Sequence, residues 1–175
     1  VRIYDDDGKV LPDGESGEIY MNMNDLSDFT YHNKDDKRVE IEREGLVTNG
    51  DVGYLDPDGY LFLNDRKRDM IISGGVNIYP AEIEAALQGM PGVQDCAVFG
   101  IPHDEFGESI AAAIESQPGV SLTPDAVKDY LRDHISAYKV PREVTFHDAM
   151  PREDTGKIFK RKLRQPYWER AGRQI

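Results

Sequence analysis

The chain has 175 residues, of which 39% are hydrophobic and 31% charged, and its formal net charge is −12. This length allows one domain, or one domain together with part of another. The acidic balance argues against a nucleic-acid partner and against docking on an anionic membrane, because both require a basic face. An ordinary acidic surface is the favoured interpretation.

The cysteine and histidine content indicates neither a disulfide framework nor a metal site. Cys96 is the single cysteine, and its apolar surroundings favour a small buried residue over a catalytic thiol. The four histidines show no metal-ligand spacing, so we expect no metal on protein ligands. The first residues do not resemble a signal peptide, and no apolar run approaches membrane-spanning length. We therefore expect a cytoplasmic protein without an integral membrane segment.

Residues 1–65 are expected to form β-strands joined by tight turns. Residues 1–4 already alternate like a strand and no initiator methionine precedes them, so we expect a piece of a longer protein. Asp-Gly turns predict hairpins at 3–11 and 55–63, and a further strand is predicted at 17–21. The stretch 22–45 is polar and irregular, with a short charged helix expected at 34–42.

Residues 66–175 alternate strands with helices, and their predicted order is β-α-β-β-α-β-α. Pro80 and Pro124 occupy favoured first-turn positions of two helices, Thr123 caps the second helix, and Gly89 ends the first. A basic helix is predicted to start near Ile158. The expected strands are 70–72, 93–101, 110–115 and 143–147, and the expected apolar stripes are Ile83, Leu87, Met90, Val127, Tyr130, Leu131 and Ile135. This order predicts an α+β domain with a small sheet covered by helices.

The segment PREDTGK, from Pro151 to Lys157, is a polar loop that ends in one lysine. Thr155 and Gly156 let the backbone turn sharply just before Lys157. A compact positive charge on a long, mobile stem suits the transient stabilisation of negative charge in a transition state. A Gly-Lys pair alone would indicate an ordinary loop, so its meaning depends on a second motif upstream.

The second motif is the run DRKRDMIISGGVNIYPAEIE, from Asp65 to Glu84. Its charge cluster lies between apolar strands, which predicts a solvated turn or linker. The paired Gly74 and Gly75 lack Cβ atoms and so allow a ligand to approach the backbone closely.

Together the two motifs resemble those of the adenylate-forming enzymes, and within them the acyl-CoA synthetases, or fatty-acid–CoA ligases. The resemblance covers nearly the whole chain but only the last part of such an enzyme. It implies that residues 1–65 are the closing β-subdomain, a partial barrel, of a large N-terminal domain, and that residues 66–175 are the mobile C-terminal domain. The implied parent enzyme activates a carboxylic acid, expected to be a fatty acid, as acyl-AMP and transfers it to CoA. It would use ATP, with Mg²⁺ bound through the nucleotide.

For the adenylation step, the resemblance assigns four residues. Lys157 is the implied catalytic residue. Arg66 and Asp51 are implied to contact the nucleotide ribose, because a charged acceptor binds two vicinal hydroxyl groups strongly. Arg68 stands at the implied hinge, where the family usually has Asp or Lys. The aspartate match is weakened because Asn49 is inserted in the Thr-Gly-Asp element, and Asp51 could belong to a strand-end turn.

For the transfer step, the resemblance implies that Gly74 and Gly75 line the channel for the pantetheine arm of CoA. Glu82 is implied to pack near the active site after domain rotation, although it could be only a first-turn helix residue. A basic tail at 157–164 could meet the phosphates of CoA, but solvation of a C-terminal helix is the favoured interpretation.

The chain lacks a Ser/Thr/Gly-rich loop that could cradle the triphosphate, and no acyl pocket can be assigned to it. We therefore expect these residues to need an N-terminal domain and to be inactive alone. One alternative is an adenylation domain that loads a carrier protein, although the sequence SGGVNIYPAEIE favours CoA as the acceptor. Another is a non-catalytic interaction module of the same fold, against which the presence of both Lys157 and Asp51 argues.

Overall fold

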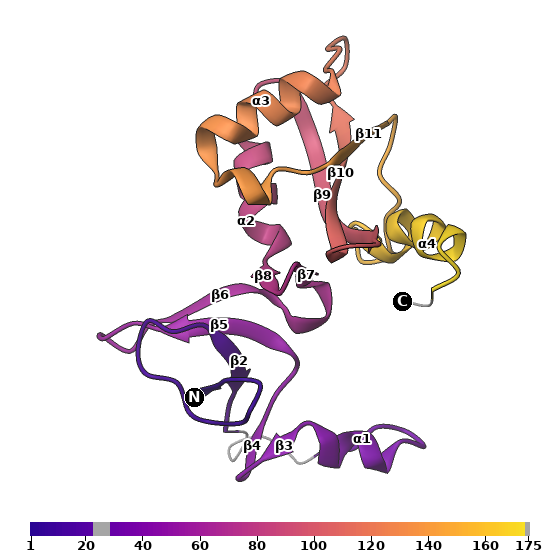
Figure 1. The fold of residues 1–175 in the computed structure, drawn as a ribbon. Helices are drawn as coiled ribbons and strands as arrows, with labels where there is room; N and C mark the ends of the chain where they lie inside the picture. Colours follow the sequence, from indigo (N-terminus) through magenta and orange to yellow (C-terminus); the bar gives the residue numbers. More distant parts are fainter. Residues whose placement is uncertain (23–28, 174–175) are drawn as a thin grey trace. The chain divides into compact units, whose positions relative to one another are not determined.

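The computed structural model describes residues 1–22 and 29–173 and divides the chain into two compact units, Val1–Arg68 and Asp69–Ile175 (Figure 1). The division predicted from the sequence lies at 65/66. The contacts place it three residues later, because residues 65 and 66 belong to a strand of the first unit. The assignment of the two units to an N-terminal and a C-terminal domain stays a prediction.

The first unit is built on an open antiparallel sheet with the strand order β1-β2-β5-β6. Its sheet does not close into a barrel, because β1 and β6 form its edges within residues 1–22 and 29–68. Its elements are β1 (Arg2–Tyr4), β2 (Gly17–Tyr20), α1 (Asp35–Glu40), β3 (Glu42–Arg43), β4 (Leu46–Val47), β5 (Asp51–Leu55) and β6 (Leu61–Arg66).

The predicted turns and strands of the first unit are largely confirmed. Gly8 and Gly59 adopt left-handed backbone angles, with φ of +82° and +84°, at the two Asp-Gly turns. The ribbon β3–β4 was not predicted; it turns at Glu44 and Gly45, which both have positive φ, inside a stretch expected to be irregular. Part of that stretch, residues 23–28, lies outside the described residues.

The run from Asp65 to Asp69 corrects one prediction. Asp65 and Arg66 were expected in a solvated turn, but they continue β6 and lie opposite Val52 and Asp51 of β5. The turn begins at Lys67, in the short 3-10 helix Lys67–Asp69. Pairing with a distant strand therefore overrides the local charge pattern.

The second unit contains a five-stranded sheet with helices on both faces. Its elements are β7 (Ile71–Ser73), β8 (Val76–Ile78), α2 (Pro80–Gln88), β9 (Val93–His103), β10 (Gly107–Ser116), α3 (Pro124–His134), a 3-10 helix (Ala137–Lys139), β11 (Glu143–His147) and α4 (Lys160–Arg170). β10 pairs antiparallel with β9 and parallel with β11. The α+β class is confirmed, with one additional strand, β8.

The two faces of this sheet bury separate cores. Alternate residues of β9 point to opposite sides, so Val98 packs with α2 and α3, whereas Ala97 and Phe99 pack with Leu163 of α4. Figure 1 shows α2 and α3 on one side of β9 and β10, and α4 on the other. Burial on both faces explains why the central parts of these two strands, residues 96–101 and 110–114, are apolar.

Local signals mark the starts of α2 and α3. Thr123 Oγ1 accepts a hydrogen bond from the backbone N–H of Ala126 at 3.2 Å, as its predicted capping role requires. Pro80 and Pro124 are the first residues of α2 and α3, and Gly89 follows the end of α2. The basic helix starts at Lys160, two residues after its predicted start.

Candidate functional site

The loop that carries Lys157 is a small, braced hairpin. The backbone N–H of Phe159 donates to the carbonyl of Pro151 at 2.7 Å, and that of Glu153 donates to the carbonyl of Lys157 at 2.8 Å. Gly156 completes the turn with φ of +84°, which a residue with a side chain adopts only under strain. The loop therefore has a defined shape.

Arg152 anchors this hairpin to the second unit. Its guanidinium donates to the carbonyl of Gly156 at 2.9 Å and forms an ion pair with Asp95 of β9. Lys157 itself is exposed and has no ion pair among the described residues. The anchored hairpin thus holds one exposed ammonium group that has no ion-pair partner among the described residues.

Asp51 and Arg66 come together although they lie 15 positions apart in the sequence. They are directly opposed on β5 and β6, and Arg66 Nε lies 3.4 Å from Asp51 Oδ1. A hollow of about 330 Å³ adjoins them, lined by Asn49, Gly50, Arg66, Lys67 and Arg68. The structure thus groups the two residues expected to hold a ribose, whereas their contact with a nucleotide stays a prediction.

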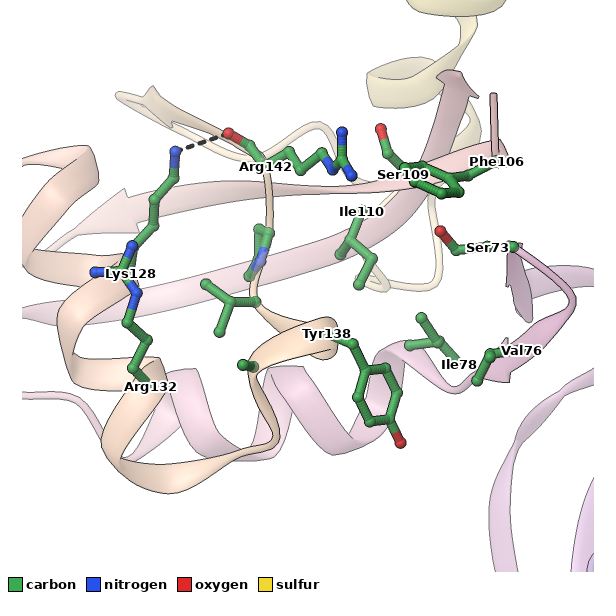
Figure 2. Close-up of a pocket in the computed structure, with 14 residues that line it drawn as sticks. Ser73, Val76, Ile78, Phe106, Ser109, Ile110, Lys128, Arg132, Tyr138 and Arg142 are labelled. Atoms are coloured by element: carbon green, nitrogen blue, oxygen red, sulfur yellow. Dashed lines mark hydrogen bonds between the residues drawn. The ribbon is translucent and has the colours of Figure 1, made fainter. Parts of the chain in front are cut away.

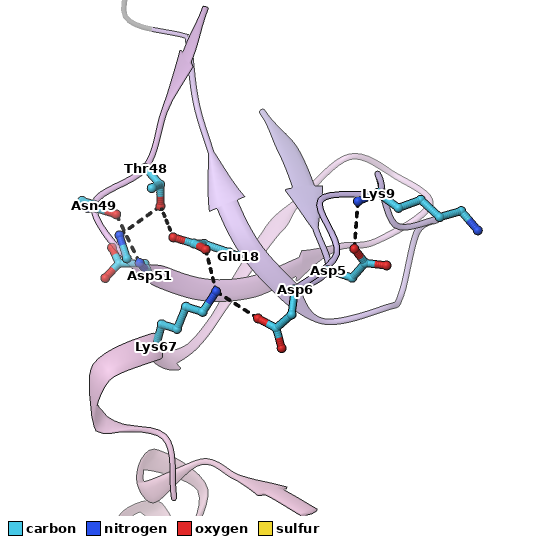
Figure 3. A network of polar contacts seen from close by, with 9 residues as sticks. Asp5, Asp6, Lys9, Glu18, Thr48, Asn49, Asp51 and Lys67 are labelled. Carbon is cyan, nitrogen blue, oxygen red and sulfur yellow. Dashed lines mark hydrogen bonds and ion pairs between the residues drawn. The ribbon is translucent and has the colours of Figure 1, made fainter. Parts of the chain in front are cut away.

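The turn before Asp51 is held by a polar network (Figure 3). Thr48, which is buried, donates to Glu18 Oε1 at 3.1 Å and accepts from the backbone N–H of Gly50 at 3.0 Å. Gly50 has φ of +81°, and the Asn49 side chain accepts a hydrogen bond from the backbone of Asp51 at 3.4 Å. The additional Asn49 is therefore accommodated within an ordered turn.

Gly74 and Gly75 form the tight turn between β7 and β8. Both have positive φ, +58° and +81°, which suits a two-residue hairpin. The backbone N–H of Gly74 donates to the carbonyl of Phe106 at 2.9 Å. A Cβ on Gly74 would lie 3.3 Å from the Phe106 ring, whereas a Cβ on Gly75 would have no described atom within 4 Å apart from those of its own residue and its two chain neighbours. Ligand access is therefore open at Gly75.

A pocket of about 640 Å³ lies beside this hairpin, within the second unit (Figure 2). Its apolar lining includes Val76, Ile78, Phe106 and Ile110. Three basic residues also line it: Lys128 and Arg132 lie at the end away from Phe106, whereas the Arg142 side chain extends toward Phe106. These basic residues were not predicted as site residues from the sequence. Lys128 and Arg132 stand four residues apart on α3, which places them on one helix face, but only the fold brings Arg142 next to them.

Arg142 is held at the edge of this pocket by aromatic side chains. Its guanidinium lies 4.9 Å from the centre of the Phe106 ring, and its Nη1 lies 2.8 Å from His103 Nε2. Lys128 Nζ donates to the carbonyl of Arg142 at 2.7 Å. Arg132 is paired with Asp129 one turn earlier on α3. The pocket therefore combines an apolar wall with a basic rim.

Glu82 lies in the first turn of α2 and binds Lys139, with Glu82 Oε2 2.5 Å from Lys139 Nζ. Desolvation acts to lower the pKa of Lys139, but the hydrogen bond and the charge of Glu82 outweigh it and raise that pKa above its usual value. Glu82 therefore has a structural partner within the second unit.

Lys160, from the basic tail, is also engaged within the second unit. Its Nζ lies 2.8 Å from Glu84 Oε1, and that carboxylate oxygen accepts from the backbone N–H of Val98 at 2.7 Å. This pair joins α4 to α2 and β9. Arg161 and Lys162 of the same helix are exposed.

Within residues 1–22 and 29–173, no group of three or more His, Cys, Asp or Glu side chains is placed to hold a metal ion. No helix in the described part of the chain is both long and apolar enough to cross a membrane.

Residues 82–157 match the family described as AMP-binding enzyme C-terminal domain. The chain is 36% identical, over 99% of its length, to fatty acid--[acyl-carrier-protein] ligase ScoC of Streptomyces coeruleorubidus, and 40% identical, over 95%, to feruloyl-CoA synthase of an Amycolatopsis species. It covers 33% and 34% of those two proteins, so it spans about a third of their length.

The solved structure of ATP-bound MatB from Rhodopseudomonas palustris superposes with a TM-score of 0.86 at 34% identity. The match covers 95% of this chain and 33% of that one. The matched domain, the relatives and the fold agree with the resemblance of the two sequence motifs to the adenylate-forming enzymes. Residues 82–157 therefore form an AMP-binding enzyme C-terminal domain, and the chain as a whole is similar in sequence and fold to about a third of the length of adenylate-forming ligases.

Proposed function

We propose that the chain acts as the closing part of an AMP-forming acid–thiol ligase, together with a larger portion that binds the acid and the triphosphate. The observation that carries the proposal is Lys157, an exposed ammonium group at the end of a braced hairpin. It is also the last residue of the matched family domain. An uncompensated charge on a defined loop suits a cation that enters an active site for one step.

In the first step, a carboxylate oxygen of the acid attacks the α-phosphorus of ATP, and the bond to pyrophosphate breaks. Mg²⁺ would accompany the nucleotide and neutralise phosphate charge. Lys157 stabilises the negative charge that accumulates around the reacting phosphorus. Asp51 accepts hydrogen bonds from the two ribose hydroxyls, and Arg66, opposite it, contacts the same sugar.

In the second step, the thiol sulfur of CoA attacks the acyl carbon, the thiol proton is released to solvent, and AMP leaves with the electrons of the bond between the acyl carbon and the phosphate oxygen. The open face of Gly75 lets the pantetheine arm pass close to the backbone. Lys128, Arg132 and Arg142 supply positive charge for the CoA phosphates at the rim of the adjoining pocket. A backbone rotation at Arg68 moves the Lys157 hairpin out of the active site and brings the Gly74–Gly75 hairpin into it. The same rotation brings Glu82 near the site.

A carrier protein is the second candidate acceptor. It is favoured by the relative ScoC, whose name specifies a fatty acid and an acyl-carrier protein. A carrier protein presents the same phosphopantetheine thiol, so the Gly75 face serves either acceptor. The basic rim favours CoA, because CoA brings additional phosphates to that surface. A fatty acid is the substrate class we favour, and the cytoplasm, which supplies both ATP and CoA, is the compartment we propose for the reaction.

The proposal is tested by a fusion in which residues 1–175 replace the matched third of feruloyl-CoA synthase. We expect the fusion to form feruloyl-CoA from ferulate, ATP and CoA, and to prefer CoA over a phosphopantetheinylated carrier protein. Residues 1–175 alone, the matched control, are expected to give no acid-dependent ATP–pyrophosphate exchange. A soluble fusion that forms neither feruloyl-AMP nor feruloyl-CoA contradicts the proposal.

A further inference from the structure

Lys67, the residue before the proposed hinge, is fixed to the first unit through both its backbone and its side chain. Its backbone N–H donates to the carbonyl of Gly50 at 2.8 Å. Its Nζ lies 2.9 Å from Asp6 Oδ1 and 3.0 Å from Glu18 Oε2, between the two carboxylates shown in Figure 3. Three contacts thus hold the residue where β6 ends.

These contacts form a closed ring with the turn that carries Asp51. One carboxylate oxygen of Glu18 accepts a hydrogen bond from the Lys67 ammonium group, and the other accepts one from the Thr48 hydroxyl. Thr48 in turn accepts from the backbone N–H of Gly50, whose carbonyl accepts from the backbone N–H of Lys67. The side chain of Lys67 therefore closes this ring of contacts around Gly50, the residue before Asp51.

The ring differs from an ordinary surface ion pair, which contributes little because water screens both charges. The side chain of Glu18 is 16% exposed, against 42% for Lys67. Removal of the ammonium group would leave a largely buried carboxylate with Thr48 as its remaining side-chain partner among the described residues. The ring would then loosen at Glu18, Thr48 and Gly50 together.

We propose that Lys67 is a positioning residue that clamps the end of β6, so that backbone rotation starts at Arg68 and does not reach Asp51 and Arg66. The hinge and the ribose contacts in this inference rest on the proposed function. A rotation at one residue exerts torque on its neighbour, and side-chain contacts at Lys67 resist that torque. The contacts of Asp51 and Arg66 with the nucleotide would then stay the same while the second unit changes orientation.

Amide hydrogen exchange on the 175-residue chain, without any substrate, tests the clamp. In Lys67→Met we expect the amides of residues 50 and 67 to exchange about 5-fold faster or more, after correction for intrinsic rates, because the largely buried Glu18 carboxylate loses a charged partner. Lys67→Arg keeps the charge and should restore slow exchange. Glu18→Gln should accelerate the same two amides, because it removes the other charge of the pair.

Lys9→Met is the matched control, because Lys9 is an exposed lysine of the same unit without an ion pair among the described residues. It should leave both amides unchanged, and the amide of Tyr20, which faces Arg2 in the pairing of β1 with β2, should keep its rate in all variants. Unchanged exchange at residues 50 and 67 in Lys67→Met overturns the clamp, as does equal acceleration at Tyr20. Because no nucleotide, acid or CoA is present, this failure is distinct from failure of the proposed function.

Discussion

Cys96 shows how burial controls chemistry at a single residue. Its side chain is buried in the core beneath α2, and its Sγ lies 3.6 Å from the carbonyl oxygen of Glu84. Desolvation, reinforced by the charges of Glu84 and Asp95, raises the pKa of the thiol from 9.0 to about 12. The expectation of a small buried residue rather than a catalytic thiol agrees with this position.

The raised pKa predicts a loss of stability at alkaline pH. Above about pH 9 the unfolded chain releases the thiol proton while the folded chain retains it, so the free energy of unfolding falls as pH rises from about 9 to about 12. Cys96→Ala should show a shallower fall over this window than the wild type. Urea unfolding of both proteins at pH 8 and pH 10.5 measures the difference, and identical pH dependence contradicts the assignment.

At the scale of single elements, the cap of α3 offers a sharp test. Thr123→Ala removes the side-chain acceptor for the Ala126 N–H and should lower the free energy of unfolding by about 1 kcal/mol. Ser121→Ala, a similar change at an exposed position two residues earlier, is the control and should change it by less than about 0.5 kcal/mol. Urea unfolding measures both, and equal effects would show that the cap contributes nothing.

Elements with strong local signals could be predicted from the sequence, whereas those defined by distant pairing could not. Proline, Thr123 and glycine mark the ends of α2 and α3 within a few residues of chain. The last two residues of β6 are strand only because β5 lies opposite them. β8 was missed because Val76–Ile78 is a three-residue strand whose identity depends on the two-glycine turn before it.

The same distinction holds for the candidate site. Lys157, Gly74 and Gly75 lie in long motifs that can be identified without a fold, and the structure supplies the bracing by Arg152. The basic rim of the pocket could not be predicted, because Arg142 joins Lys128 and Arg132 only when β11 packs beside β10 and α3 covers the sheet. Single basic residues in an acidic chain carry no local signal of their own.

At the scale of the whole molecule, the proposed rotation at Arg68 predicts unequal effects on the two half-reactions. Arg68→Pro fixes φ near −65° and should trap one orientation, so that one half-reaction falls at least about tenfold more than the other. Adenylation and transfer are measured separately in the feruloyl-CoA synthase fusion. Arg68→Lys keeps both charge and backbone freedom and should leave both rates near wild type. If Arg68→Pro also leaves both near wild type, the rotation occurs elsewhere.

The central claim is that Lys157 serves adenylation alone, and Lys157→Ala in the fusion tests it most directly. Loss of one charge-stabilising group should slow feruloyl-AMP formation about 100- to 1,000-fold, equivalent to about 3 to 4 kcal/mol. An interaction made only in the first transition state does not affect the second, so transfer from preformed feruloyl-AMP to CoA should keep its rate. Lys9→Ala, the matched control, should change neither step. An equal loss in both half-reactions would contradict the account and make Lys157 a structural residue.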